Sequence, residues 1–496
     1  MVSRDRPPEY LGLGGRLGAG PAPELVAAGF ALEMAEAPSL HDGFALADIA
    51  HTLALLDAGV LPEGDGARLL GALLEMAAMP SDKFPYDAAF GDPWNSRERV
   101  LEERAGPSAG WLGVGRPRRE AARVALRLAL RRGVLDAHAA LLALADAYLV
   151  QARRHRDSLM SDSTYLQPAQ PTTLGYVLAG HLQPVVRHLG RLEEAYRWVN
   201  LSPAGAGGTT GSSLAVDRDR LATGLGFGGV VEHARDAMWQ TDGLVDLLAV
   251  LAAAATEAGQ VAADLEIWAS PAYGYVELAD GYCRVSALMP QKKNPYALAV
   301  VRQGAGAVAG ALAGVLSGLR TPTARTDHFL LAPGEVRRAL GTFTTCTRLL
   351  AGVIGTMSVD TAALAEGAGD PGLVLGDLAD EMVVGGVCDR RTAHRVLGEA
   401  ARAAQSQQRA VTVDDVASAA GQAGLALPPA MLESLADPMA LLRRRTVKGG
   451  WADLPRLLEV AGRDLAGHRR FGDGALAAID SAEAALLATA RARATS

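Results

Sequence analysis

The residues best able to do chemistry lie in one polar segment, which reads SALMPQKKNP over residues 286–295. Asn294 is a residue type that caps helices and Pro295 suits a first helical position, so a helix is predicted to begin there. The unpaired N–H groups of that helix end, together with Lys292 and the Asn294 amide, would bind a carboxylate. The same positive field would stabilise the carbanion formed when Ser286, acting as a base, removes a proton from the adjacent carbon. On spacing alone, a capped helix start with solvated lysines is the competing interpretation.

Long helices must position this segment. Ala and Leu are abundant and aromatic residues make up only 5%, which favours helix over strand. Residues 117–156 contain one glycine and no proline after Pro117, which predicts a helix of nearly forty residues. Further long helices are predicted after Pro171, over 235–267, after Pro295 and over 335–357.

The predicted fold is all-α with three helical domains. A central bundle of long helices is expected to separate two smaller units, because proline and glycine interrupt the helical pattern on both sides of it. The predicted boundaries are 1–115 for the N-terminal helical domain, 116–366 for the central bundle and 367–496 for the small C-terminal helical domain.

The composition limits the classes of binding partner and the cellular compartment that we expect for this protein. The 496 residues carry 48 Lys and Arg against 55 Asp and Glu, so no basic excess indicates nucleic acid. The three cysteines are far apart and predict neither disulfides nor a zinc cluster, and the N-terminus lacks a signal peptide's apolar core; together these favour the cytoplasm. Residues 297–319 are apolar but rich in Gly and Ala and carry Arg302, which predicts close helix packing and no membrane partner. No cofactor and no metal ligand is predicted.

The chemistry-bearing segment resembles the signature loop of the fumarase/aspartase superfamily, and LMPQKKNP is the form found in argininosuccinate lyases. Further segments resemble that family in the same order, and in total the resemblance covers about residues 30–350. They include GRPRRE at 115–120, similar to GRSRND; TYLQPAQP at 164–171, similar to THLQRAQP; and DLEIWAS at 264–270.

The resemblance implies a mostly helical homotetramer with a twenty-helix core and active sites assembled from three subunits. It implies that Ser286 is the catalytic base and that Lys292 and Asn294 hold the carbanionic carboxylate. Arg116 and Thr164 are then expected to hold a small carboxylate-bearing substrate.

The departures from the family pattern concern the leaving-group side. Tyr165 stands where the family has a catalytic histidine, and Ala299 stands where it has the glutamate that pairs with that histidine. Loss of both partners indicates a rebuilt pocket, because loss of one would leave a buried group unpaired. Tyr165 is either a proton donor to the leaving group or a space filler. The positions that recognise the arginine part of argininosuccinate fall at about Ala37 and His41, and residues 319–335 hold no counterpart of the family's downstream LPxxYNKDxQEDK segment.

Other departures lie nearer the predicted pocket. Arg119 and Glu120 replace the asparagine and aspartate of GRSRND. Trp94 and Trp239 would make the pocket more apolar, or they are ordinary core residues. The Gly-rich run at 205–211 has no following Lys-Ser/Thr and so is no phosphate loop; by resemblance it is a tight loop beside the active site.

These patterns favour an argininosuccinate lyase-like enzyme. The expected reaction is β-elimination that breaks a C–N bond and releases fumarate, or the reverse addition or a cyclisation, on a substrate other than argininosuccinate, in specialised metabolism. The alternative is a catalytically silent family member with a structural or partner-binding role.

Overall fold

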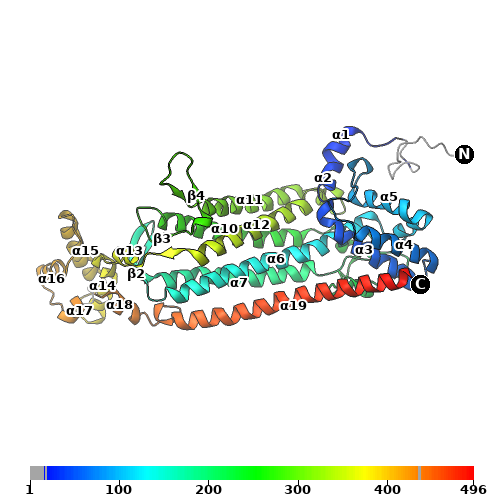
Figure 1. Ribbon diagram of the computed structural model, residues 1–496. Coiled ribbons are helices and arrows are strands. Elements are labelled where there is room, and N and C mark those ends of the chain that lie inside the picture. The colour runs from blue at the N-terminus through cyan, green and yellow to red at the C-terminus, as the bar shows by residue number, and fades with distance from the viewer. Residues whose placement is uncertain (1–15, 17–18, 434–436, 496) are drawn as a thin grey trace.

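Five long helices running side by side form the centre of the protein, as the computed structural model shows for residues 16, 19–433 and 437–495 (Figure 1). The predicted all-α architecture with a central long-helix bundle is confirmed. The five helices are α6 (Arg118–Arg154), α7 (Leu174–Val199), α10 (Asp242–Trp268), α11 (Tyr296–Gly318) and α12 (Ala332–Thr356).

The bundle core is built from aliphatic side chains of all five helices, which explains why the long Ala- and Leu-rich segments form helices here. Burial of such side chains stabilises a helix by about 1.5–3 kcal/mol for each large one. α7 runs through Pro184 without ending, and the helix predicted over 235–267 is instead two helices, α9 (Ala234–Trp239) and α10, separated at Gln240 and Thr241.

Buried arginines hold α6 to the end of α7 and to the segment that follows it. Arg127 lies over the Trp198 ring at 4.0 Å, and Arg131 lies over the Phe227 ring at 4.3 Å and donates to the Gly226 carbonyl at 2.6 Å. Burial lowers the pKa of both guanidinium groups to about 10, so they stay charged at neutral pH. Carbonyl dipoles and aromatic faces therefore compensate these buried cations.

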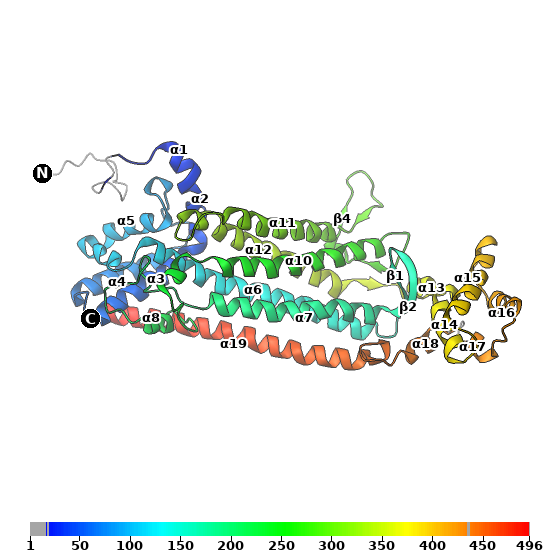
Figure 2. The ribbon, with the colours of Figure 1, turned by 180° about the vertical axis from the view of Figure 1, so that it is seen from behind.

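The N-terminal unit packs against one end of the bundle and has its own aliphatic core (Figure 1). Its principal helices are α3 (Ala37–Asp57), α4 (Glu63–Ala77) and α5 (Pro93–Ala105), preceded by the short α1 (Pro23–Leu25) and α2 (Ala31–Met34). The connecting α8 (Arg218–Gly224) lies beside this end of the bundle (Figure 2).

The predicted C-terminal domain is divided in the structure. A compact group of short helices with a separate core lies at the far end of the bundle. It comprises α14 (Leu375–Val384), α15 (Arg390–Ser406), α16 (Val413–Gln422), α17 (Pro429–Glu433) and α18 (Pro438–Arg444), and α13 (Thr361–Gly367) precedes it.

The last helix, α19 (Leu454–Ala494), leaves this group and runs back along the bundle to the N-terminal unit (Figures 1 and 2). Leu458 and Leu465 join the bundle core, and Leu486 joins the N-terminal core. The expectation that residues 367–496 form one unit is therefore wrong for this helix, because its apolar face is covered by the other two units.

Three short antiparallel pairs of strands form the irregular parts. They are β1 (Leu159–Thr164) with β2 (Gln167–Thr173), β3 (Val276–Glu277) with β6 (Ser358–Val359), and β4 (Arg284–Val285) with β5 (Lys293–Asn294). Two of these pairs, β1–β2 and β4–β5, carry predicted site residues.

Three of the described helices, α6, α10 and α11, are long and apolar enough to cross a membrane by length and composition. In the structure they lie together in the bundle. Only 33% of the most apolar window of α11 is buried, so one face of this helix is uncovered in the single chain. The absence of a membrane partner stays a prediction.

Candidate active site

The predicted base, Ser286, lies in a hairpin that projects from the side of the bundle beside α11 (Figure 1). Strands β4 and β5 form its stem, and the Ser286 Oγ accepts hydrogen bonds from the backbone N–H groups of Leu288 (3.3 Å) and Met289 (3.0 Å). Leu288 is 85% exposed at the tip. Because a hydroxyl oxygen that accepts two N–H groups is better able to bear negative charge, this turn favours a serine base.

Asn294 does not cap the following helix, contrary to the prediction. It belongs to β5, and its Nδ2 donates to the Arg284 carbonyl across the hairpin at 2.9 Å. α11 instead begins at Tyr296 after Pro295, with no side-chain cap. The amide therefore closes the stem of the hairpin in this chain, and its predicted contact with a carboxylate stays a prediction.

The two adjacent lysines of the hairpin have different surroundings. Lys293 Nζ lies 2.8 Å from both Glu277 Oε1 and Asp280 Oδ1, and these ion pairs raise its pKa. Lys292 is exposed, and its ammonium makes no ion pair or hydrogen bond with the described residues. Of the two cations, Lys292 is thus the one that is available to a ligand carboxylate.

Thr164 and Tyr165 lie at the tip of the β1–β2 hairpin. Tyr165 (φ 55°) and Leu166 (φ 59°) form the two-residue turn. Both adopt the left-handed backbone conformation, which is sterically unfavourable for residues other than glycine. Such a conformation costs about 1–3 kcal/mol per residue and is concentrated at functional sites. Tyr165 is 98% exposed, so it fills no space within its own chain.

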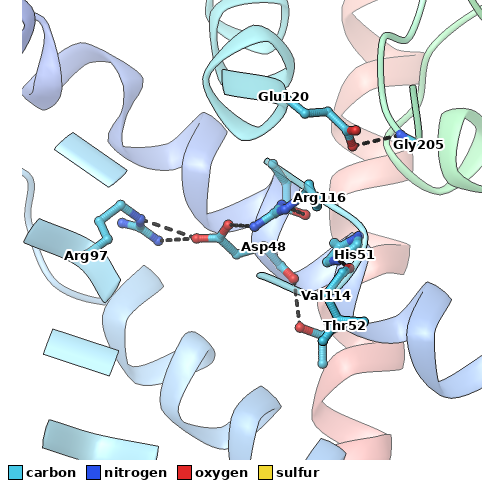
Figure 3. A network of polar contacts seen from close by, with 9 residues as sticks. Asp48, His51, Thr52, Arg97, Val114, Arg116, Glu120 and Gly205 are labelled. Atoms are coloured by element: carbon cyan, nitrogen blue, oxygen red, sulfur yellow. Dashed lines mark hydrogen bonds and ion pairs between the residues drawn. The ribbon is translucent and has the colours of Figure 1, made fainter. Parts of the chain in front are cut away.

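Arg116 is committed to a buried ion pair with Asp48 of α3 (Figure 3). Its Nη2 donates to Asp48 Oδ1 at 2.6 Å and its Nη1 donates to the Ala47 carbonyl at 3.1 Å. The side chain is 2% exposed, so Arg116 fixes α3 to the start of α6 and does not face a ligand. Its predicted role in holding substrate has no support in this geometry.

Arg118, which is not among the predicted substrate-binding residues, faces solvent two positions later. Its side chain is 41% exposed, and its Nε lies 3.5 Å from Asp92 Oδ2. The GRPRRE sequence places one arginine on each side of Pro117 but does not indicate which of them is buried. Only the fold decides that Arg116 is buried and Arg118 is exposed.

Glu120 orders the Gly-rich loop. One carboxylate oxygen accepts from the backbone N–H of Gly205 at 2.8 Å (Figure 3). The other accepts from the N–H of Gly207 at 2.6 Å, and both glycines have positive φ angles. Trp239 Nε1 donates to the Gly208 carbonyl at 2.9 Å from the other side. Trp94, by contrast, is buried in the bundle core and is an ordinary core residue. The glutamate that replaces the family's aspartate thus holds the loop in place.

The single chain places the predicted site residues in three separate regions. The two hairpins lie toward the α13 end of the bundle, whereas Arg116 lies with α3 at the other end (Figures 1 and 2). Hollows of about 810 Å³ between α3, α6, α12 and α19 and of about 460 Å³ between α3, α8 and α19 are lined by none of them.

The fold and the hairpin sequence define the class of protein. A family model described as Lyase matches residues 30–310, which is more than half of the chain. The chain therefore belongs to the fumarase/aspartase superfamily of lyases, and within it to the argininosuccinate lyase-like members.

Argininosuccinate lyases of two organisms match over most of their length. The chain is 33% identical over 445 residues to the argininosuccinate lyase of Halobacterium salinarum, covering 88% of this chain and 87% of that one. It is 32% identical over 451 residues to the argininosuccinate lyase of Nocardia farcinica, covering 88% and 92%.

Solved structures of other proteins share the fold of this chain over most of its length. A crystal structure of EDDS lyase in complex with formate superposes with a TM-score of 0.85 at 25% identity, covering 98% of this chain and 99% of that one. A class II fumarase from Schistosoma mansoni shares the fold with a TM-score of 0.70 at 13% identity, covering 83% and 91%.

Proposed function

We propose that this protein is a β-eliminating carbon–nitrogen lyase that releases fumarate from a succinyl-bearing amine other than argininosuccinate, or adds the amine to fumarate in reverse. The observation that carries the proposal is the pairing of Ser286 with an unengaged, exposed Lys292 on one projecting hairpin in a chain of this family. The relatives at about a third identity are argininosuccinate lyases, which supports the reaction class.

In the proposed reaction, Ser286 acts as an alkoxide, and its Oγ takes the proton from the carbon next to a carboxylate to become a neutral hydroxyl. The electron pair left behind delocalises into that carboxylate, where Lys292 offsets the added negative charge. The pair then forms the carbon–carbon double bond as the C–N bond breaks, and the amine leaves with a proton donated by Tyr165. Full exposure of Tyr165 and the strain of its turn fit a residue that acts on a pocket outside its own chain.

The arginine-recognising positions support a substrate other than argininosuccinate. Ala37 is fully buried, and His41 is 1% exposed, with its Nδ1 hydrogen-bonded to Tyr86 Oη at 2.9 Å. Neither side chain can meet a guanidinium group without unpacking α3. The leaving group is thus expected to be an amine that needs no recognition at these two positions.

A homotetramer would complete the site. α11 exposes a run of small residues on the face that the bundle leaves uncovered, and small residues let helices approach closely. The residues of this face are Gly306, Ala307, Ala309, Gly310 and Ala313. Packing of this face against another subunit would account for its composition and would bring hairpins from different chains together. In that assembly we assign the substrate contact of the GRPRRE segment to the exposed Arg118.

The direct test is incubation of the protein with fumarate and a panel of ammonia, alkylamines, diamines, amino acids and guanidines, following the loss of fumarate absorbance. Turnover with an amine that gives an N-substituted aspartate supports the proposal. Turnover of argininosuccinate at rates comparable to the best amine contradicts the substrate assignment. No turnover with any amine, together with no thermal shift by dicarboxylates, would favour the catalytically silent alternative.

A further inference from the structure

Two histidines and one glutamate from three different helices converge away from the hairpins. His138 belongs to α6, Glu193 to α7 and His468 to α19. Glu193 Oε1 lies 3.3 Å from His138 Nε2 and 2.6 Å from His468 Nδ1, and one ligand atom from each residue lies within 4.8 Å of the other two. We propose that His138, Glu193 and His468 form a binding site for a divalent transition-metal ion, with Zn²⁺ as the expected occupant.

The separations suit such an ion. Bonds of about 2.0–2.2 Å from a tetrahedral Zn²⁺ place neighbouring ligand atoms roughly 3.4 Å apart. The His138–Glu193 separation already matches this value. The His468–Glu193 separation is shorter by less than about 1 Å, so the Glu193 carboxylate would shift by that amount when the ion binds. Two imidazoles and one carboxylate are ligands that favour Zn²⁺ over Mg²⁺ or Ca²⁺.

The surroundings keep the ligands oriented. The His138 ring packs against Phe471 with centroids 5.7 Å apart, and Gly472 leaves room beside it, since a Cβ there would lie 3.3 Å from His138 Nδ1. The neighbouring cation Arg469 is held 2.8 Å from Asp146.

The site is accessible from one side. The His138 side chain is 2% exposed, whereas Glu193 is 13% and His468 is 16% exposed. An ion can therefore reach the three ligands, and a water molecule can complete its coordination. Because the ligands come from α6, α7 and α19, the bound ion would tie the returning C-terminal helix to the bundle.

The test uses the full chain without a histidine tag. We expect one Zn²⁺ per chain by equilibrium dialysis with elemental analysis, a higher melting temperature with Zn²⁺ than with a chelator, and visible d–d bands when Co²⁺ is added. His468→Asn keeps a hydrogen-bond donor for Glu193 but is a poor ligand. It should weaken Zn²⁺ binding by more than the roughly 10–100-fold that loss of an outer-shell partner costs.

A matched control separates this site from other histidines. His394→Ala removes an exposed histidine of α15 and should leave the stoichiometry and the Co²⁺ spectrum unchanged. Circular dichroism checks that each variant is folded. Absence of a stoichiometric ion in the unmodified chain, or equal Zn²⁺ affinity in His468→Asn, overturns the proposal and leaves the three residues as a hydrogen-bonded link only.

Discussion

Arg116 Nη2 lies 2.6 Å from Asp48 Oδ1, and both side chains are almost completely buried (Figure 3). The other oxygen, Asp48 Oδ2, lies 3.3 Å from Arg97 Nη2, so one carboxylate compensates two buried guanidinium groups. The three residues come from the start of the bundle, from α3 and from α5. This network therefore fixes the N-terminal unit to the bundle and removes Arg116 from the set of ligand-binding cations.

Arg116→Met is expected to destabilise the protein. It removes one partner of a buried pair, which costs about 3–5 kcal/mol in general, and the lower end applies because Asp48 keeps Arg97. Arg118→Met, at the exposed position, should change stability by less than about 0.5 kcal/mol and raise KM. Urea unfolding and steady-state kinetics of both variants check this. The prediction fails if Arg116→Met is as stable as the unmodified protein and only KM changes.

Ser286→Ala is expected to abolish turnover, with a loss of at least about 100-fold in kcat, because it removes the group that is proposed to take the proton. The fold should be unchanged, since Ser286 is only partly buried and its hydroxyl accepts two local N–H groups. Ser406→Ala, at an exposed helix end, is the control. Unchanged kcat in Ser286→Ala would remove the base assignment.

Substitution of each of the two adjacent lysines should change different kinetic parameters. Lys292→Met should lower kcat and kcat/KM together, because the charge that it offsets develops in the transition state. Lys293→Met removes the ion pairs with Glu277 and Asp280, so it should loosen the stem of the hairpin and mainly affect KM. Comparison of the two kcat values is the measurement. A larger kcat loss in Lys293→Met would reverse the assignment.

The buried His51 should make stability depend on pH. Burial lowers its pKa to about 3, whereas an unfolded histidine titrates near 6.5. Below pH 6.5 the unfolded chain therefore binds a proton that the folded chain does not, and stability falls as pH falls from 6.5 toward 3, by up to about 1.4 kcal/mol per pH unit.

His51→Gln tests this dependence. The glutamine can still donate to the Val114 carbonyl, which accepts from His51 Nε2 at 3.0 Å. The free energy of unfolding of both proteins should be measured between pH 7.5 and 4.5, and the difference between them isolates this residue. An identical slope in the two proteins would show that His51 is not responsible.

Gly310→Leu should disrupt the proposed tetramer without harming the single chain. A Cβ at Gly310 meets nothing within 4 Å in this chain, and replacing a helical glycine with leucine favours the helix by up to about 1 kcal/mol. Light scattering should therefore show a smaller species that retains full helicity. Gly398→Leu on α15, which is equally open, is the control. A tetramer that persists in Gly310→Leu would place the interface on another face.

Much of the architecture was readable from local patterns. The long proline-free segment after Pro117 became α6, and the Gly- and Ala-rich segment after Pro295 became α11, because helix propensity and apolar periodicity agree there. Asn294 shows where such patterns fail. A capping residue before a proline predicts a helix start, but pairing of β4 with β5 takes that residue into a strand.

The sequence by itself determined the helical class, the lyase family and the segment that carries Ser286 and Lys292, since these depend on composition and on contiguous motifs. Only the tertiary structure decided that Arg116 is buried while Arg118 is exposed, that Lys293 rather than Lys292 is engaged, and that α19 returns along the bundle to place His468 beside His138 and Glu193. Burial and long-range contact depend on which helices pack together, and residues 330 positions apart carry no local signal of their meeting.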